Sequence, residues 1–136
     1  MTVIRDNDAR RTETPNGVMT TYASPTQGAT ALALWRVEML ADRKGPVHAM
    51  DTEQIWTFLA GTATVDLDGE TLTVGAGDTL VLPADVRRQI ITAEGFTAVV
   101  TSPSPSYAYN PDAVTPPGAC DLAPRDDQRV LPAWIA

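Results

Sequence analysis

Short runs rich in Thr, Val, Leu and Ile recur along this chain between residues that favour turns, chiefly Gly, Pro and Asp. The clearest case is TATVDLDGETLTV, residues 62–74, in which two alternating segments flank Asp68-Gly69. A two-residue turn of this type needs positive φ angles, which Gly adopts without strain, so we predict a hairpin here. No span shows apolar residues at helical spacing over a dozen positions. Evenly spaced strands joined by tight turns predict an all-β fold, an antiparallel sandwich or barrel.

The same punctuation marks the remaining strands. Further strands are expected in the ranges 29–40, 53–61, 75–83 and 88–102. From Pro103 onward the pattern changes, because prolines become frequent and no strand rhythm is visible. Trp134 and Ile135, near the end of this segment, need an apolar surface to pack against. We therefore expect one β-domain over residues 1–102 and a Pro-rich C-terminal arm over 103–136, lying on the barrel or on a partner subunit.

Composition excludes several classes of function. The net charge of −7 and the isoelectric point near 4.4 leave no basic stripe to neutralise phosphates, which argues against nucleic-acid binding. No apolar run is long enough for a membrane span, and no hydrophobic segment follows the charges of residues 1–11, so we expect no secretory signal. Cys120 is the only cysteine, which fits a reducing compartment. We expect a cytoplasmic protein whose partner is a small molecule.

The turn residues also match a known pattern. Gly61 follows Gln54 with six residues between them, and the run Gly77-Asp-Thr-Leu-Val-Leu-Pro83 opens a second motif. In this spacing residues 30–100 resemble the cupin family of small β-barrels. The resemblance implies an antiparallel double-stranded β-helix, that is, a cupin jelly-roll barrel, and it also implies a homodimer.

The resemblance breaks down at the metal ligands. The positions that hold a divalent metal in the family correspond here to His48, Met50, Gln54 and Arg88. Imidazole is a conventional ligand, but a thioether suits little besides Cu(I) and an amide oxygen is a weaker ligand. A guanidinium has no lone pair to donate and repels a cation. Asp85 also replaces a motif glycine. We expect no metal and no other cofactor.

Strand alternation indicates which side chains share a face. In the family register the inward groups are Met50 with His48, Gln54 with Trp56 and Phe58, and Arg88 with Ile90. These form a mostly apolar pocket with an aromatic wall and a few polar groups, which is typical of a small-molecule site. Arg36 and Glu38 are further candidates for substrate contact, although they alternate with Trp35 and Val37 and one sequence does not say which set faces inward.

The polar groups favour a metal-independent enzyme of isomerase, cyclase or lyase type. In this interpretation Arg88, helped by the Gln54 amide, stabilises negative charge on a carbonyl oxygen. His48, with an ordinary pKa near 6.5, moves protons on an anionic or conjugated carbonyl substrate. The chemistry would be enolisation leading to isomerisation, cyclisation, dehydration or decarboxylation.

Other interpretations stay open at this level. One is a metal-dependent cupin, dioxygenase-like or cyclase-like, with an unusual ligand set. Another is a noncatalytic cupin that binds or senses a small anionic metabolite. His48 would then be a hydrogen-bonded barrel residue and Arg88 a structural tie to Glu38 or Asp85, since buried polar groups normally find partners.

Overall fold

The computed structural model describes residues 1–112 and 128–136; the part of the predicted arm between them, with Cys120, lies outside the described residues. The only helix in the described part is a 3-10 turn at Asp6–Asp8. The all-β prediction is confirmed. The strands are β1 Arg10–Thr14, β2 Gly17–Ala23, β3 Leu32–Met39, β4 Arg43–Lys44, β5 Ala49–Met50, β6 Gln54–Leu67, β7 Glu70–Gly75, β8 Thr79–Leu82, β9 Arg88–Thr92, β10 Phe96–Pro103, β11 Ala108–Tyr109 and β12 Arg129–Val130.

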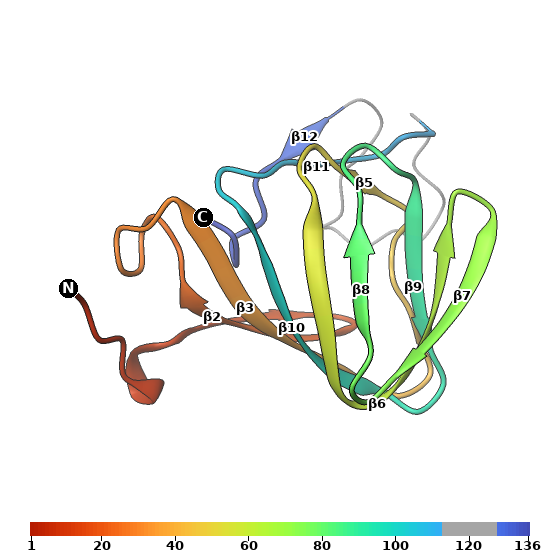
Figure 1. Ribbon diagram of the computed structural model, residues 1–136, viewed down its shortest axis with the longest axis horizontal. Helices are drawn as coiled ribbons and strands as arrows, with labels where there is room; N and C mark the ends of the chain where they lie inside the picture. Colours follow the sequence, from red (N-terminus) through yellow and green to blue (C-terminus); the bar gives the residue numbers. More distant parts are fainter. Residues whose placement is uncertain (113–127) are drawn as a thin grey trace.

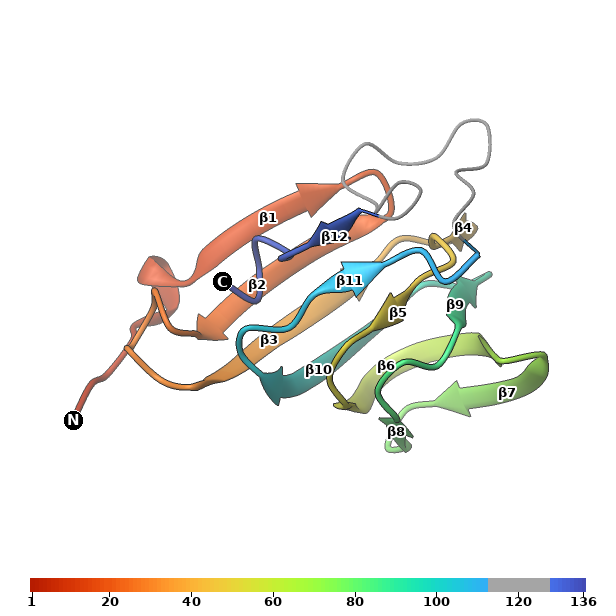
Figure 2. The same cartoon turned by 90° about the horizontal axis from the view of Figure 1, so that it is seen from above.

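Two sheets make up the fold. The larger has nine strands in the order β1-β2-β3-β10-β6-β9-β4, with β7 and β8 also paired to β6. It curls strongly, so that its strands enclose an interior (Figure 1). The smaller sheet, in the order β12-β11-β5, lies across one end of the curl (Figures 1 and 2). Together they form the predicted jelly-roll barrel. Within residues 1–112 and 128–136, no helix has the length and hydrophobicity needed to cross a membrane.

Strand β6 belongs to both sides of the curl. Its first part pairs with β8 and β10, and its second part, from Thr62 on, pairs with β7 and β9. The change occurs at Gly61, whose φ is +74°. A Cβ at this position would overlap the carbonyl group of Gly95. Glycine is therefore required here both by the backbone angle and by the close approach of β10.

The hairpin predicted at Asp68-Gly69 is confirmed. Leu67 pairs with Glu70, and the two residues between them have φ values of 49° and 86°. Two consecutive positive φ angles define the turn whose twist matches that of the flanking strands. Local chemistry alone therefore determined this part of the fold.

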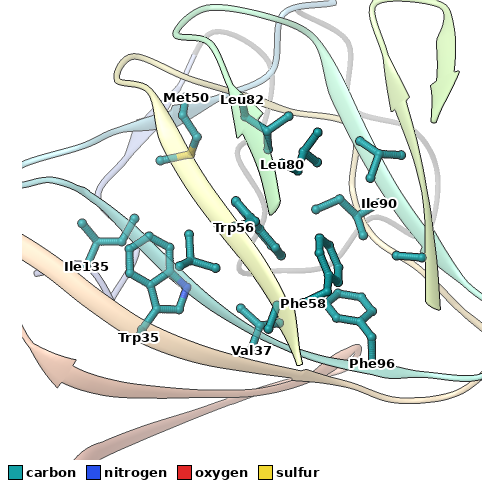
Figure 3. Close-up of a cluster of buried hydrophobic side chains, with 14 of the residues drawn as sticks. Trp35, Val37, Met50, Trp56, Phe58, Leu80, Leu82, Ile90, Phe96 and Ile135 are labelled. Atoms are coloured by element: carbon teal, nitrogen blue, oxygen red, sulfur yellow. The ribbon is translucent and has the colours of Figure 1, made fainter. Parts of the chain in front are cut away.

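The core lies between the curled strands. Trp35, Trp56, Phe58 and Phe96 point into the interior from neighbouring strands (Figure 3). The ring centroids of Trp56 and Phe58 are 6.1 Å apart, and those of Phe58 and Phe96 are 5.2 Å apart. Such offset and tilted aromatic contacts add to the free energy gained by burying apolar area. This aromatic cluster supports one wall of the site.

The described end of the C-terminal arm lies on the same chain. The backbone oxygen of Trp134 accepts a hydrogen bond of 2.8 Å from the Thr21 hydroxyl. The oxygen of Ala136 accepts one of 2.8 Å from the Arg10 guanidinium. Residues 128–136 are thus hydrogen-bonded to β1 and β2, which no pattern in the sequence predicted.

Candidate functional site

A cavity of about 140 Å³ lies inside the barrel. This volume suits a compound of about one ring, since a cavity of roughly 150 Å³ is known to hold benzene. Its wall is mainly apolar and aromatic, with Met19, Trp35, Val37, Met39, Trp56, Ile90 and Phe96 among its members. The polar side chains on the wall are Thr14, Asn16, His48 and Gln54. In the described part of the chain, no Asp, Glu, Lys or Arg lines the cavity.

The predicted pocket residues divide into two groups. His48, Met50, Gln54, Trp56 and Ile90 all line the cavity. By contrast, Phe58 and Arg88 are fully buried behind the wall, where neither contributes to the lining. Phe58 belongs to the aromatic core, and Arg88 lies behind the wall, where it donates a hydrogen bond to the wall residue Gln54.

The alternation of β3 places Trp35 and Val37, not Arg36 and Glu38, on the inner face. Trp35 and Val37 are 2% and 4% exposed and line the cavity. Arg36 and Glu38 lie on the outer face and pair with each other at 3.5 Å. The expectation that they contact substrate does not fit this placement, because burying an indole and a valine gains more free energy than burying two charges.

Arg88 makes three side-chain hydrogen bonds, all to neutral acceptors. Its guanidinium donates to the Val86 oxygen at 3.3 Å, the Pro83 oxygen at 2.9 Å and the Gln54 side-chain oxygen at 3.3 Å. Burial lowers the pKa of Arg88 to about 10, a shift that nearby Tyr109 and Asp85 oppose. The group therefore stays charged at neutral pH. The predicted tie to Glu38 or Asp85 is replaced by bonds to loop carbonyls and to Gln54.

Gln54 is held in one orientation. Its side-chain oxygen accepts from Arg88 and also, at 3.0 Å, from the indole N–H of Trp56. Gln54 is 3% exposed and lines the cavity, and both of its side-chain hydrogen bonds within the described residues are made by the oxygen. Since both neighbours are obligate donors, the oxygen must face them. The two amide N–H groups are then the part of the side chain left without a hydrogen bond among the described residues.

His48 presents the opposite polarity. Its Nδ1 lies 3.0 Å from the carbonyl oxygen of Pro46, which can only accept, so Nδ1 carries the proton. The Nε2 atom then has a free lone pair on a residue that lines the cavity. Desolvation lowers the pKa of His48 to about 4, the Pro46 bond opposes this, and the charge of Arg88 lowers it further. The imidazole is neutral at physiological pH.

The family's metal-binding positions do converge here, but their residues do not fit a divalent cation. His48 and Arg88 are joined by a pair of backbone hydrogen bonds, 3.0 and 2.8 Å long. The Gln54 oxygen is the one oxygen ligand that these side chains offer to a metal, and it already accepts a hydrogen bond from the Arg88 guanidinium. No group of three or more His, Cys, Asp and Glu side chains in the described part could hold a metal ion. A cation here would meet a fixed positive charge.

The sequence matches the family model described as the cupin domain over residues 35–102. The chain belongs to the cupin family. No curated protein matches it in sequence. The predicted range of the cupin motifs, residues 30–100, agrees with the matched range. The motif glycines Gly61 and Gly77 lie at bends of the backbone and have positive φ angles.

Solved cupins share the fold at low sequence identity. KdgF from Halomonas sp. is 19% identical, with a TM-score of 0.63, covering 76% of this cupin and 94% of that chain. An RmlC-like cupin from Shewanella frigidimarina is 19% identical, with a TM-score of 0.66 and coverages of 77% and 93%. The polyketide cyclase RemF from Streptomyces resistomycificus is also 19% identical, with a TM-score of 0.65 and coverages of 78% and 83%. These likenesses establish the fold.

Sequence reasoning missed the contribution of the chain's ends to the cavity. Trp134 and Ile135 from the C-terminal arm line it, as do Thr14 and Asn16 from the first hairpin. The only available signal was the apolar character of Trp134 and Ile135 within a proline-rich segment. It indicated packing, but not where.

Proposed function

We propose that this cupin is a metal-independent enzyme that transfers a proton at carbon next to a carbonyl group. The observation that carries the proposal is that Gln54 and His48 line one apolar cavity, Gln54 with its oxygen held by two donors and His48 with its Nδ1 held by Pro46, so the Gln54 N–H groups and His48 Nε2 are the atoms left to meet a ligand. A donor and a base of fixed orientation in a water-poor pocket are what enolisation needs.

The reaction follows from these two groups. The Gln54 amide donates to the carbonyl oxygen of the substrate, and His48 Nε2 removes a proton from the adjacent carbon. Electrons of the broken C–H bond form an enolate whose charge rests on the oxygen held by Gln54. The imidazolium then returns the proton to the same carbon, giving exchange, or to another conjugated position, giving isomerisation. One preorganised donor of this kind contributes about 10²–10³-fold in rate.

Arg88 has an indirect role in this proposal. Its guanidinium donates hydrogen bonds to oxygens of Pro83, Val86 and Gln54, and Arg88 does not line the cavity. By donating to the Gln54 oxygen it polarises the amide and strengthens the N–H groups on the other side. Arg88 is therefore a positioning residue, and the oxyanion donor is Gln54.

The structural neighbours support the reaction class. One of them, RemF, is a polyketide cyclase, and cyclisation of a polyketide passes through enolate chemistry. The two aromatic walls formed by Trp35 and Trp56 suit a flat, conjugated compound.

Hydrogen–deuterium exchange tests the proposal directly. Acetophenone and cyclohexanone, each with one ring, are incubated with the protein in deuterated buffer, and loss of the proton signal next to the carbonyl is followed by NMR. We expect the wild type to exceed the buffer rate and His48→Ala to lose at least about 10²-fold of that excess. Arg36→Ala, on the outer face, is the control and should retain it.

The same assay separates the alternatives. A wild-type rate equal to that of buffer contradicts the enzymatic proposal. A rate that disappears with EDTA and returns with Zn²⁺ or Mn²⁺ contradicts metal independence and favours the metal-dependent alternative.

A second candidate function is favoured by one observation, the pKa of His48 near 4. An imidazole this weakly basic is better suited to accepting a hydrogen bond from an enol or phenol than to removing a proton. In that case the chain binds such a compound without turnover, and calorimetry would show binding in the absence of exchange.

A further inference from the structure

The inference drawn here rests on the proposed function and concerns which ligands the cavity admits. Among the described residues, Gln54 is the one amide on the wall whose orientation is set by two donors, the Arg88 guanidinium at 3.3 Å and the Trp56 indole at 3.0 Å. Trp56 lies on the same strand two residues away, so it shares the inward face with Gln54. A rotated amide would place its own N–H groups against two other donors and leave a buried guanidinium short of an acceptor.

At Gln54 the wall therefore offers hydrogen-bond donors to a ligand, and not an acceptor. Trp35 also lines the cavity and carries an indole N–H, which is a second donor type on the wall (Figure 3). An oxygen acceptor on the ligand is matched by these groups, whereas a donor on the ligand finds an acceptor only at Nε2 of His48.

The wall also lacks a counter-charge. Among residues 1–112 and 128–136 none of the lining side chains is Asp, Glu, Lys or Arg. Arg88 is close, but its three donating nitrogens point to Val86, Pro83 and Gln54. A carboxylate entering the cavity would lose its hydration and gain only the longer-range attraction of Arg88, without a direct ion pair, which is unfavourable in an apolar site.

We infer that the cavity is specific for neutral carbonyl compounds of about one ring, and that Arg88 and Trp56 impose this specificity by locking the Gln54 amide with its N–H groups inward. Of the two substrate types that the sequence suggested, anionic or conjugated carbonyl, this inference keeps only the second. The ligand is recognised by an uncharged acceptor oxygen, and its charge develops only during the reaction.

A matched pair of probes tests the inference by binding alone. 2′-Hydroxyacetophenone and salicylate share the ring and hydroxyl and differ in a methyl ketone against a carboxylate. Titrations followed by calorimetry at pH 7.5 should show the ketone binding at least tenfold more tightly to the wild type. Equal or tighter binding of salicylate, or no binding of either probe, overturns the inference.

Gln54→Glu is the sharpest variant. Its carboxylate can still accept from Arg88 and Trp56, so the fold keeps both hydrogen bonds, but it presents an oxygen to the cavity where the amide presented N–H groups. We expect a melting temperature at least as high as that of the wild type and at least tenfold weaker binding of the ketone. Gln128→Glu adds the same charge at an exposed position and should leave the affinity unchanged.

Trp56→Phe tests whether the fixed orientation of the Gln54 amide matters, since the amide itself is kept. It removes one of the two donors that orient Gln54 but keeps an aromatic wall. The affinity for the ketone should therefore fall, and the ratio of ketone affinity to salicylate affinity should decrease. Unchanged affinity in both Gln54→Glu and Trp56→Phe overturns the inference. Because these are binding readouts, they stand or fall independently of the deuterium-exchange assay: a specific neutral pocket without exchange refutes only the enzymatic proposal.

Discussion

The guanidinium of Arg88 lies against the side-chain oxygen of Gln54, with 3.3 Å between Nη1 and Oε1. These residues are 34 positions apart and occupy two of the positions at which the cupin family holds its metal. Their direct hydrogen bond occupies the Gln54 oxygen, which is the atom that a cation would need as a ligand at this position.

Removing this guanidinium should destabilise the fold strongly. Arg88→Met leaves the Pro83 and Val86 oxygens without their buried donor and the Gln54 oxygen with Trp56 alone, and each unsatisfied group costs about 1–3 kcal/mol. We expect the free energy of unfolding to fall by at least about 3 kcal/mol in urea titrations.

The neighbouring arginine is the control for this experiment. Arg87 pairs with Asp112 at 3.0 Å, but the two side chains are 35% and 45% exposed. Arg87→Ala should therefore cost less than about 1 kcal/mol. Similar losses in the two variants would contradict the structural role assigned to Arg88.

The stability of the protein should depend on the protonation of His48. Its pKa is lowered from 6.5 to about 4 on folding, so between these values the unfolded chain binds the proton and the folded chain does not. This contribution is complete above pH 6.5 and is lost as the pH falls toward 4, by up to about 3 kcal/mol. Urea titrations from neutral pH down to pH 4.5 measure it.

A His48→Gln variant isolates this effect from the carboxylates that titrate nearby. The loss of stability on acidification should be smaller in the variant than in the wild type by the contribution of His48. Parallel curves for the two proteins would show that the imidazole is not desolvated as the structure indicates.

Two glycines with similar backbone angles should respond differently to alanine. Gly61 and Gly69 have φ of +74° and +86°, so either substitution costs about 1–2 kcal/mol for the left-handed conformation. At Gly61 the new methyl would also overlap Gly95, whereas at Gly69 it meets nothing within 4 Å. Thermal unfolding should show the larger loss for Gly61→Ala. Equal losses would mean that β10 can move away from β6 at little cost.

The outer face of the barrel should pair with a second copy of the chain. Leu34, Thr101, Ile55 and Val81 lie side by side in one row across β3, β10, β6 and β8. The three aliphatic residues of the row are 38%, 42% and 56% exposed. A contiguous apolar patch of this kind on a sheet marks an interaction surface.

A homodimer fits this face because it carries both signs of charge. Arg36 and Glu38 lie on the same strand face as Leu34, so a two-fold axis can bring each near the opposite charge of the partner. Sedimentation velocity should show a dimer for the wild type and a monomer for the Ile55→Glu, Val81→Glu double variant. Leu40→Glu, an exposed position outside the row, should remain dimeric, and a monomeric wild type at every concentration would refute the prediction.

The parts predicted correctly from the sequence are those governed by local rules. The Asp68-Gly69 hairpin follows from the φ angles of two residues, and the inward placement of Met50, Gln54 and Trp56 follows from strand alternation. The role of Arg88 could not be obtained in this way. A guanidinium is long enough to reach a cavity or to turn back toward loop carbonyls, and only the positions of Pro83 and Val86 decide between these.

By itself the sequence determined the cupin barrel and the absence of a conventional ligand set, because turn chemistry, strand period and side-chain donor type are properties of the residues. Tertiary structure decided which face of β3 turns inward, since Trp35 and Arg36 alternate equally well until one must be buried. It also decided that Gln54, not Arg88, lines the cavity. That outcome depends on two donors converging on one amide oxygen, one of them from a strand far along the chain.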